Sequence, residues 1–459
     1  MSFRLSLAAI IAPLFVMGVA FAQRADQPPT NAPPSPTTTT PTPPPAEPAQ
    51  DAPSSTSVEP SAPVSAPAAD AQPAPLVPAP LPLTDPASEP HAEKAAASPH
   101  VGFRRNFAGS IQLDYMAIPS ETTGRQIALD GATAEVSLKI AMDFNNKVSA
   151  SVKACVACHG FEVGMAYFDL RGADELNVRV GRFTPSFGEF PSRHDPANHR
   201  TSDKPLPYDM GRMVRLNEWN EGVLPTPWVD NGIELNGTHY FGDHLQASYA
   251  AYAVGGPRAA SDPVDFDYKL SRSGESYYVD NNSRPVVGGQ AVLSYFAGKF
   301  NMTAGASTMR GTYDPDHHLP FQIWGGHVVL RFRDIFLRTE YLRRRTKMAL
   351  GDDPGADFKY GPGKDGTYDP WFVKDGGYSE LEFPVSSRVT VVLREDFLRR
   401  RGNVLKSSLL RSDSALVRHT AGLAVAVAQS IRVKLSFERY DFSDFEDENV
   451  IHLGIAGPF

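Results

Sequence analysis

The sequence predicts an all-β protein: a transmembrane antiparallel β-barrel of about sixteen strands over residues 101–459, preceded by a disordered proline-rich segment. Two observations carry this prediction. Short segments alternate between apolar and polar residues, as strands with two different faces do. The turns between the segments are alternately short and long, as in a barrel that crosses a membrane.

Residues 1–22 predict a secretory signal peptide. An apolar run over residues 5–19 follows the positively charged Arg4, and the sequence AFA at 20–22 fits the small-x-small cleavage pattern. The apolar run is too short for a spanning helix, and polar residues follow it directly. We therefore expect the mature chain to leave the cytosol.

Residues 23–100 form a second compositional block. They hold 22 of the chain's 41 prolines and contain no Phe, Trp or Tyr. Such a segment cannot bury enough apolar surface to offset the entropy of ordering, so we expect a disordered tether. It carries eight acidic and two basic residues, a net charge of −6 out of the whole chain's −8. The rest of the chain is therefore near neutral, and no basic patch in it indicates a nucleic-acid partner.

The predicted strands each have one apolar and one polar face. In the segment from residue 387, Val391 and Leu393 point one way, whereas Arg394 and Asp396 point the other way. Residues 101–459 also contain no run of 18 apolar residues that would predict a spanning helix. A soluble sandwich would show the same strand pattern, so the turn lengths decide between the two folds.

The turns alternate strictly in length, which a barrel requires and a sandwich does not. The short ones read FNNK, GADE, FGDH, AGK, RDI, PVSS and AQS. The long ones fall at roughly 118–131, 185–229, 256–285, 311–320, 347–376, 400–415 and 443–448. In a bacterial outer-membrane barrel the short turns are periplasmic and the long loops external.

The last segment, NVIHLGIAGPF, supports this location. Ile451, Leu453 and Ile455 alternate with polar or small residues, and the chain closes on Phe459. A last strand that ends on Phe resembles the assembly signal of bacterial outer-membrane proteins. We therefore expect a lipid-embedded protein in the outer membrane of a Gram-negative cell, exported by its signal peptide.

The stretch LNVRVGRFTPSFGEF, residues 176–190, resembles the strand-and-loop signature of the phosphate-selective porin O and P family. The residues that match are Val180, Gly181, Phe183, Phe187 and Gly188, while Pro185 stands one position early. The resemblance implies a sixteen-stranded barrel, an inward fold of the long loop 185–229 and a homotrimer. It does not carry the family's anion ladder to particular residues of this chain.

Two segments, LRTEYLRRR and LREDFLRRR, echo each other. Each has an inward-facing arginine and acid, Arg338 with Glu340 and Arg394 with Asp396. We interpret these pairs as the alternating charges that are ordinary on a water-filled barrel wall. The alternative interpretation is a patch that sets the pore's selectivity. We expect the arginine triplets that follow to lie at the external rim.

The only two cysteines, Cys155 and Cys158, precede His159 in a C-x-x-C-H motif. This is the attachment motif of c-type haem: two thioether bonds to the macrocycle and one axial histidine nitrogen on the iron. We expect one covalent haem c per chain. The alternative is a loop disulfide, which needs only the cysteines. A thioredoxin-like redox motif is not indicated, because no βαβ pattern surrounds the cysteines. A zinc site is not indicated either, because the chain has no further cysteines.

The position of the motif follows from the strand phase. Lys153 and Cys155 fall on the lumen face of their strand, and the turns on both sides of the hairpin 153–162 are short. The hairpin tip therefore lies at the external end, beside the start of the 185–229 loop.

We expect His159 to be the proximal iron ligand. His199 is our first candidate for the distal ligand and His194 the second, because both lie in the loop expected to fold inward. The remaining candidates are Met210, Met213 and Met165.

These features favour an outer-membrane porin-like monohaem cytochrome that transfers electrons and exchanges them with a periplasmic or extracellular cytochrome. One haem near the external end cannot span a core about 25–30 Å thick, so a partner cytochrome that enters the barrel, or further haems elsewhere, would be needed. The rival is a passive diffusion porin for small polar solutes or anions, with a Cys155–Cys158 disulfide. Nothing favours an enzyme, because a haem peroxidase needs an open iron site with a distal acid–base residue.

Overall fold

The computed structural model describes residues 104–117, 131–157, 160–209, 222–259, 266–267 and 280–459. The predicted signal peptide 1–22 and tether 23–100 lie outside the described residues. Within these, no helix has the length and apolar character needed to cross a membrane.

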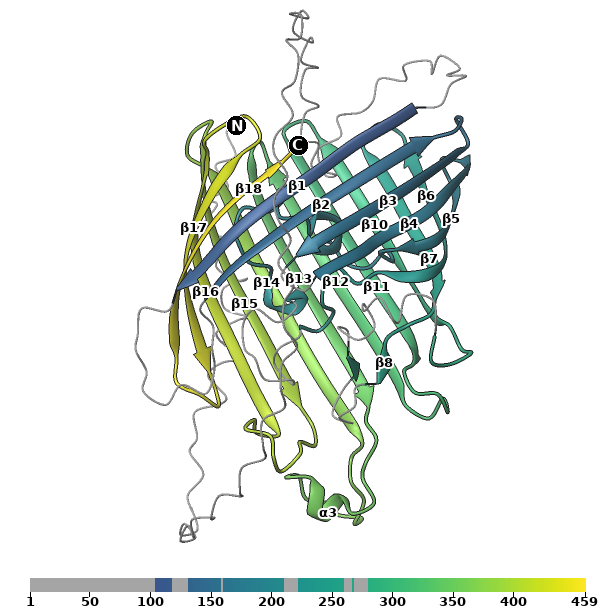
Figure 1. Cartoon of the computed structure of the whole chain (residues 1–459), viewed down its shortest axis with the longest axis vertical. Coiled ribbons are helices and arrows are strands. Elements are labelled where there is room, and N and C mark those ends of the chain that lie inside the picture. Colours follow the sequence, from purple (N-terminus) through teal and green to yellow (C-terminus); the bar gives the residue numbers. More distant parts are fainter. Residues whose placement is uncertain (1–103, 118–130, 158–159, 210–221, 260–265, 268–279) are drawn as a thin grey trace, which may run out of the picture.

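The described chain forms one closed antiparallel barrel of sixteen strands, which confirms the predicted fold class (Figure 1). Neighbours in sequence are neighbours in the sheet, and β1 closes the ring by pairing with β18. The strands are β1 (Arg104–Ala117), β2 (Gly131–Asp143), β3 (Val148–Ala157), β4 (Gly160–Ala173), β5 (Leu176–Phe183), β6 (Asp230–Phe241), β7 (Leu245–Val254), β10 (Val286–Ala297), β11 (Phe300–Thr312), β12 (Pro320–Phe332), β13 (Ile335–Lys347), β14 (Trp371–Pro384), β15 (Val389–Arg401), β16 (Asp413–Ala426), β17 (Arg432–Phe442) and β18 (Glu448–Pro458).

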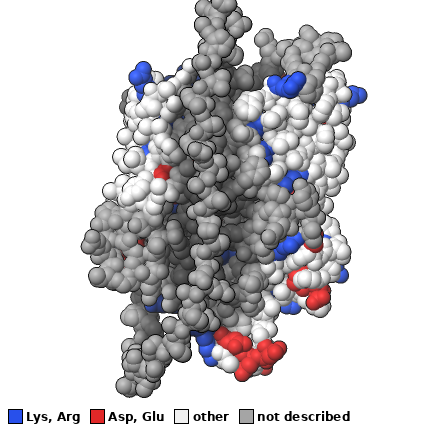
Figure 2. Space-filling view, in the orientation of Figure 1, with Lys and Arg blue, Asp and Glu red and all other residues white. Residues whose placement is uncertain are grey.

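Apolar side chains cover the outside of the barrel, and charged ones lie inside it. Leu393 is 46 % exposed on the outer face of β15, whereas its neighbour Arg394 is 3 % exposed on the inner face. Figure 2 shows the same division: most of the visible barrel surface is uncharged, and acidic side chains gather at one end. This inverts the pattern of a soluble protein and is the arrangement of a barrel that spans a membrane.

Most turns alternate in length as predicted, but the alternation is not strict. The β3–β4 connection spans only residues 158–159, and the last two connections, 427–431 and 443–447, have the same length. All long connections leave from one end of the barrel, here called the long-loop end. Two small elements lie there, the ribbon β8 (Arg258–Ala259) with β9 (Phe266–Asp267) and the single helical turn α3 (Pro354–Asp357).

The wall is uneven in height. β3 has 10 residues and β5 has 8, whereas β1, β4, β14 and β16 have 14 each. The β3–β4 hairpin, whose tip is residues 158–159, therefore lies beside a short strand where the wall is low. The tip itself lies outside the described residues.

The C-terminal residue takes part in closing the barrel. The backbone of Phe459 exchanges two hydrogen bonds with Gly109 of β1, at 2.8 and 2.9 Å. The Phe459 ring lies over Gly109, so that a Cβ added at this glycine would overlap the ring. Glycine thus provides the space that the terminal aromatic ring needs.

We expect Gly109→Val to impair barrel closure, because overpacking of this kind costs about 1–3 kcal/mol and forces the Phe459 ring away. The measurement is the fraction of chain that migrates as a folded, heat-modifiable barrel on a gel. Ala108→Val is the control, since adjacent residues of a strand point to opposite faces. Equal folded fractions in both variants would contradict this role of Phe459.

Candidate functional site

The connection between β5 and β6, residues 184–229, is here called the inner loop. Its described residues, 184–209 and 222–229, lie inside the barrel. It contains two short 3₁₀ turns, η1 (Phe190–Arg193) and η2 (Leu206–Tyr208), each with a proline in its first turn. Phe187, Leu206 and Tyr208 are at most 2 % exposed, because they pack against inward-facing residues of the wall. The described part of the inner loop is thus the core of the barrel.

Glu340 of β13 holds the first part of the inner loop. Its carboxylate accepts hydrogen bonds from the backbone N–H of Glu189 (2.9 Å) and Phe190 (3.4 Å) and from the Tyr208 hydroxyl (2.6 Å). Glycine at position 188 allows the loop backbone to lie this close to Glu340. Its φ is +69°, and a Cβ there would overlap both Tyr208 and Glu340. One wall carboxylate therefore fixes both 3₁₀ turns.

Glu189 adds a second carboxylate at this place. Burial alone would raise its pKa, but the guanidinium groups of Arg193 and Arg338 hold the pKa of Glu189 below its ordinary value. The ion pair Arg193 Nε–Glu189 Oε1 is 2.8 Å long. Glu189 is therefore ionised and paired at neutral pH.

Asp203 holds the second part of the inner loop. Its carboxylate lies between two wall arginines, pairing with Arg394 Nη2 of β15 at 2.8 Å and with Arg418 Nη1 of β16. Asp396 of β15 completes the contact by accepting the backbone N–H of Leu206 at 3.0 Å. All four charged side chains are at most 3 % exposed.

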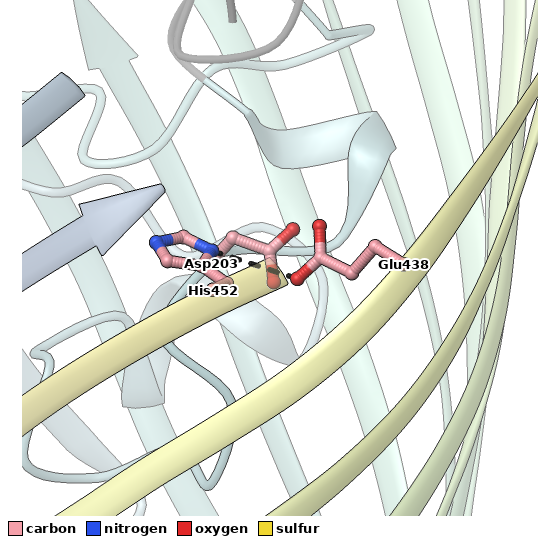
Figure 3. Close-up of side chains that lie close together, drawn as sticks. All are labelled: Asp203, Glu438 and His452. Atoms are coloured by element: carbon pink, nitrogen blue, oxygen red, sulfur yellow. Dashed lines mark ion pairs between the residues drawn. The ribbon is translucent and has the colours of Figure 1, made fainter. Parts of the chain in front are cut away.

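Figure 3 shows that Asp203 also lies beside Glu438 of β17 and His452 of β18. One ligand atom from each of the three lies within 4.8 Å of the others. His452 Nδ1 is 3.5 Å from Glu438 Oε1, and Arg418 Nη1 is 3.8 Å from Glu438 Oε2. The Arg418 guanidinium lies between the two carboxylates and offsets part of their charge, so the cluster is part of the loop anchor.

The inner loop also reaches β3, the strand of the C-x-x-C-H motif. Lys153 forms an ion pair with Asp195, and its Nζ is 3.4 Å from His194 Nε2. Val152 and Val156 are exposed on the outer face of β3, so the alternate residues Lys153 and Cys155 face the lumen.

The His194 side chain is a neutral imidazole at neutral pH. Burial, and after it the Lys153 ammonium, lower the pKa of His194 to about 4. Its Nδ1 lies 2.6 Å from the Pro191 carbonyl oxygen, to which a neutral ring donates. The lone pair is then on Nε2, which faces Lys153.

His199 lies elsewhere in the inner loop. It is 1 % exposed, with its ring centroid 5.7 Å from that of Phe190 and its Nδ1 2.8 Å from the Thr201 carbonyl oxygen. Burial, and then the Lys434 ammonium, lower the pKa of His199 well below its ordinary value. The contacts between the inner loop and β3 pass through His194 and Asp195.

The remaining candidate iron ligands do not lie in the described part of the inner loop. Met165 of β4 stands opposite Lys153 in the strand register. Cys158, His159, Met210 and Met213 lie outside the described residues.

The echoed pairs Arg338–Glu340 and Arg394–Asp396 do face inward, but the expectation of a wet wall is wrong. All four are at most 4 % exposed, because the inner loop covers them. The arginine triplets stand near the long-loop end, and their middle residues Arg344 and Arg400 are fully buried.

The sequence does not indicate Asp203 of the loop or its wall partners Arg418, Glu438 and His452. Single charged or titratable residues on strands and loops carry no local signal. The doubled Arg–acid pattern was the one signal that pointed to this wall. It would have identified an anchor only if the path of the loop had been known.

A hollow remains on the opposite side of the lumen. It has a volume of about 270 Å³ and lies against β5, β6, β7 and β10. Arg179 and Glu234 are its charged lining residues, 3.5 Å apart, and Arg179 is also paired with Asp169 at 2.8 Å. The inner loop touches this side where Ser186 N–H donates to Glu234 at 2.9 Å. Gly188 adds two contacts: its carbonyl oxygen accepts from Gln290 Nε2 of β10 at 2.7 Å, and its N–H donates to Ser307 Oγ of β11 at 2.9 Å.

The chain matches none of the protein-family models and none of the curated proteins with which it was compared. Among solved structures it is similar to the outer-membrane channel DcaP of Acinetobacter baumannii, with 12 % identity, 78 % of this chain and 98 % of that chain covered and a TM-score of 0.48. It is also similar to OmpF of Salmonella typhi (12 %, 77 % and 97 %, 0.48) and to an anion-selective porin of Comamonas acidovorans (12 %, 78 % and 100 %, 0.45).

Proposed function

We propose that this chain is a diffusion pore of the outer membrane for small polar solutes. The observation that carries the proposal is the inner loop. It narrows a closed barrel from within, has its buried ion pairs with the arginines of β13, β15 and β16, and leaves a polar hollow beside β5, β6, β7 and β10. A barrel of sixteen strands is wide enough for an aqueous channel. The trimer implied by the resemblance remains part of the proposal.

The test is single-channel conductance of the purified full-length chain in a planar lipid bilayer. We expect stable steps in simple salt, smaller than those of a variant that lacks residues 190–225. A chain that folds as a barrel but gives no conductance, with or without that segment, would overturn the proposal.

A second candidate function, haem-based electron transfer with a periplasmic or extracellular cytochrome, is favoured by one observation. Cys155 faces the lumen on β3, and Lys153, two residues before it, contacts the neutral His194. His194 holds its Nδ1–H on a backbone carbonyl, which is the state of a metal-ligating histidine. The residues that would hold the haem are Cys155, Cys158, His159 and, in preference to His199, His194. When bound, the haem would supply one-electron chemistry.

A haem stain of the full-length chain on a denaturing gel tests this second function. A stained band that disappears in Cys155→Ser supports it. An unstained band, with thiols that react only after reduction, supports the Cys155–Cys158 disulfide instead.

A further inference from the structure

The two sides of the lumen differ in charge. The inward face of β13–β17, here called the charged wall, carries buried arginines, lysines and carboxylates that are covered by the inner loop. The inward face of β6, β7, β10 and β11, here called the amide wall, carries many neutral side chains with hydroxyl or amide groups, and two buried carboxylates, Asp230 and Glu234 of β6. Most of the neutral side chains are half-buried, and several of them border the hollow.

The strand register joins these neutral groups into a continuous band. Asn236 of β6 pairs with Ala250 of β7, which pairs with Gln290 of β10. One row further toward the short turns, Thr238 and Ser248 are hydrogen-bonded across β6 and β7 at 3.1 Å.

The band continues onto the last of these strands. Ser294 of β10 and Thr303 of β11 are hydrogen-bonded at 3.0 Å. A solute beside this wall meets hydroxyl and amide groups that can both donate and accept hydrogen bonds.

The charged groups at the hollow are paired with one another. Arg179 is shared between Asp169 and Glu234, and its guanidinium also lies 4.5 Å from the centre of the Tyr167 ring. Glu234 accepts hydrogen bonds from the backbone of Ser186 and, at 3.2 Å, from the amide of Asn236. Asp230, the other carboxylate of this wall, accepts backbone N–H groups and is 9 % exposed. These buried carboxylates already have partners, so they replace little of the hydration that a passing ion loses.

Passage through a narrow aqueous path costs each solute part of its hydration, and the wall must replace the lost interactions. Hydroxyl and amide groups replace the hydrogen bonds of a solute rich in hydroxyls. They replace far less of the hydration of an ion, whose desolvation cost is several times higher. Resting on the proposed pore function, we infer that the passage selects uncharged, hydroxyl-rich solutes, such as small sugars and polyols, over ions of the same size.

The experiment is osmotic swelling of liposomes that contain the purified full-length chain. Glucose, gluconate and glucosamine share one carbon skeleton and are neutral, anionic and cationic at neutral pH. We expect swelling in glucose to be several-fold faster than in either charged compound. In a bilayer under a salt gradient, the reversal potential should lie close to zero.

Charge variants of Ser248 sharpen the test, because this hydroxyl lines the hollow. Ser248→Asp should shift the reversal potential toward cation selectivity and Ser248→Lys toward anion selectivity, and both should slow glucose. Asn146→Asp, in the exposed turn between β2 and β3, is the control for added charge and should leave all three readings unchanged.

The outcomes separate the inference from the function on which it rests. Conductance with faster swelling in gluconate or glucosamine than in glucose would overturn the selectivity and leave the pore standing. Equal reversal potentials in Ser248→Asp and Ser248→Lys would show that the path runs elsewhere and would also overturn it. Absence of both swelling and conductance would overturn the proposed pore function itself.

Discussion

Replacing Asp203 by alanine should release the inner loop from the charged wall and strongly destabilise the protein. The substitution removes the carboxylate that Arg394 and Arg418 share, at sites where both guanidinium groups are at most 3 % exposed. Breaking a buried ion pair by removal of one partner costs about 3–5 kcal/mol, because the remaining charge is left in a low-dielectric environment. We expect a larger, noisier conductance and a lower temperature of the heat-modifiability transition.

Asp413→Ala is the matched control for this prediction. Asp413 also pairs with an arginine, Arg399, but its side chain is 53 % exposed, and exposed pairs contribute about 0–1 kcal/mol. Asp203→Asn keeps the shape of the side chain and separates the loss of charge from the loss of packing. If Asp203→Ala and Asp413→Ala behaved alike in both measurements, the proposed anchor would be wrong.

Replacing Glu340 by alanine should free the other part of the inner loop. Its carboxylate accepts two backbone N–H groups and the Tyr208 hydroxyl, and a buried donor left without a partner costs about 1–3 kcal/mol. We expect the variant to show frequent current fluctuations between a wild-type level and a wider one, since the first 3₁₀ turn is no longer fixed.

A graded series checks this expectation. Tyr208→Phe removes one of the donors to Glu340 and should give fewer fluctuations than Glu340→Ala. Thr339→Ala is the control, since Thr339 neighbours Glu340 on the opposite face of β13. Quiet, wild-type currents in Glu340→Ala would show that the carboxylate does not hold the loop.

The barrel could be predicted from the sequence because its signals are local. The faces of β15 follow from the alternation of Leu393 with Arg394, and the sixteen strands follow from the turn lengths. The position of Lys153 on the lumen face follows in the same way.

The loop contacts could not be predicted, because they join residues that no local pattern relates. Glu189 and Glu340 are 151 positions apart, and Leu206 and Asp396 are 190 apart. The burial of Arg338 and Arg394 depends on those contacts, so the expectation of a wet wall failed. The haem motif remains a prediction, since Cys158 and His159 lie outside the described residues.

The distance along the chain between the inner loop and its anchors has a consequence for biogenesis. The loop is synthesised well before Glu340, Arg394 and Arg418, so its early contacts are limited to neighbouring strands such as β3, where Lys153 pairs with Asp195. Until the late strands arrive, its aromatic side chains lack the wall that buries them in the finished barrel. We therefore expect the packing of the lumen to be a late event in assembly.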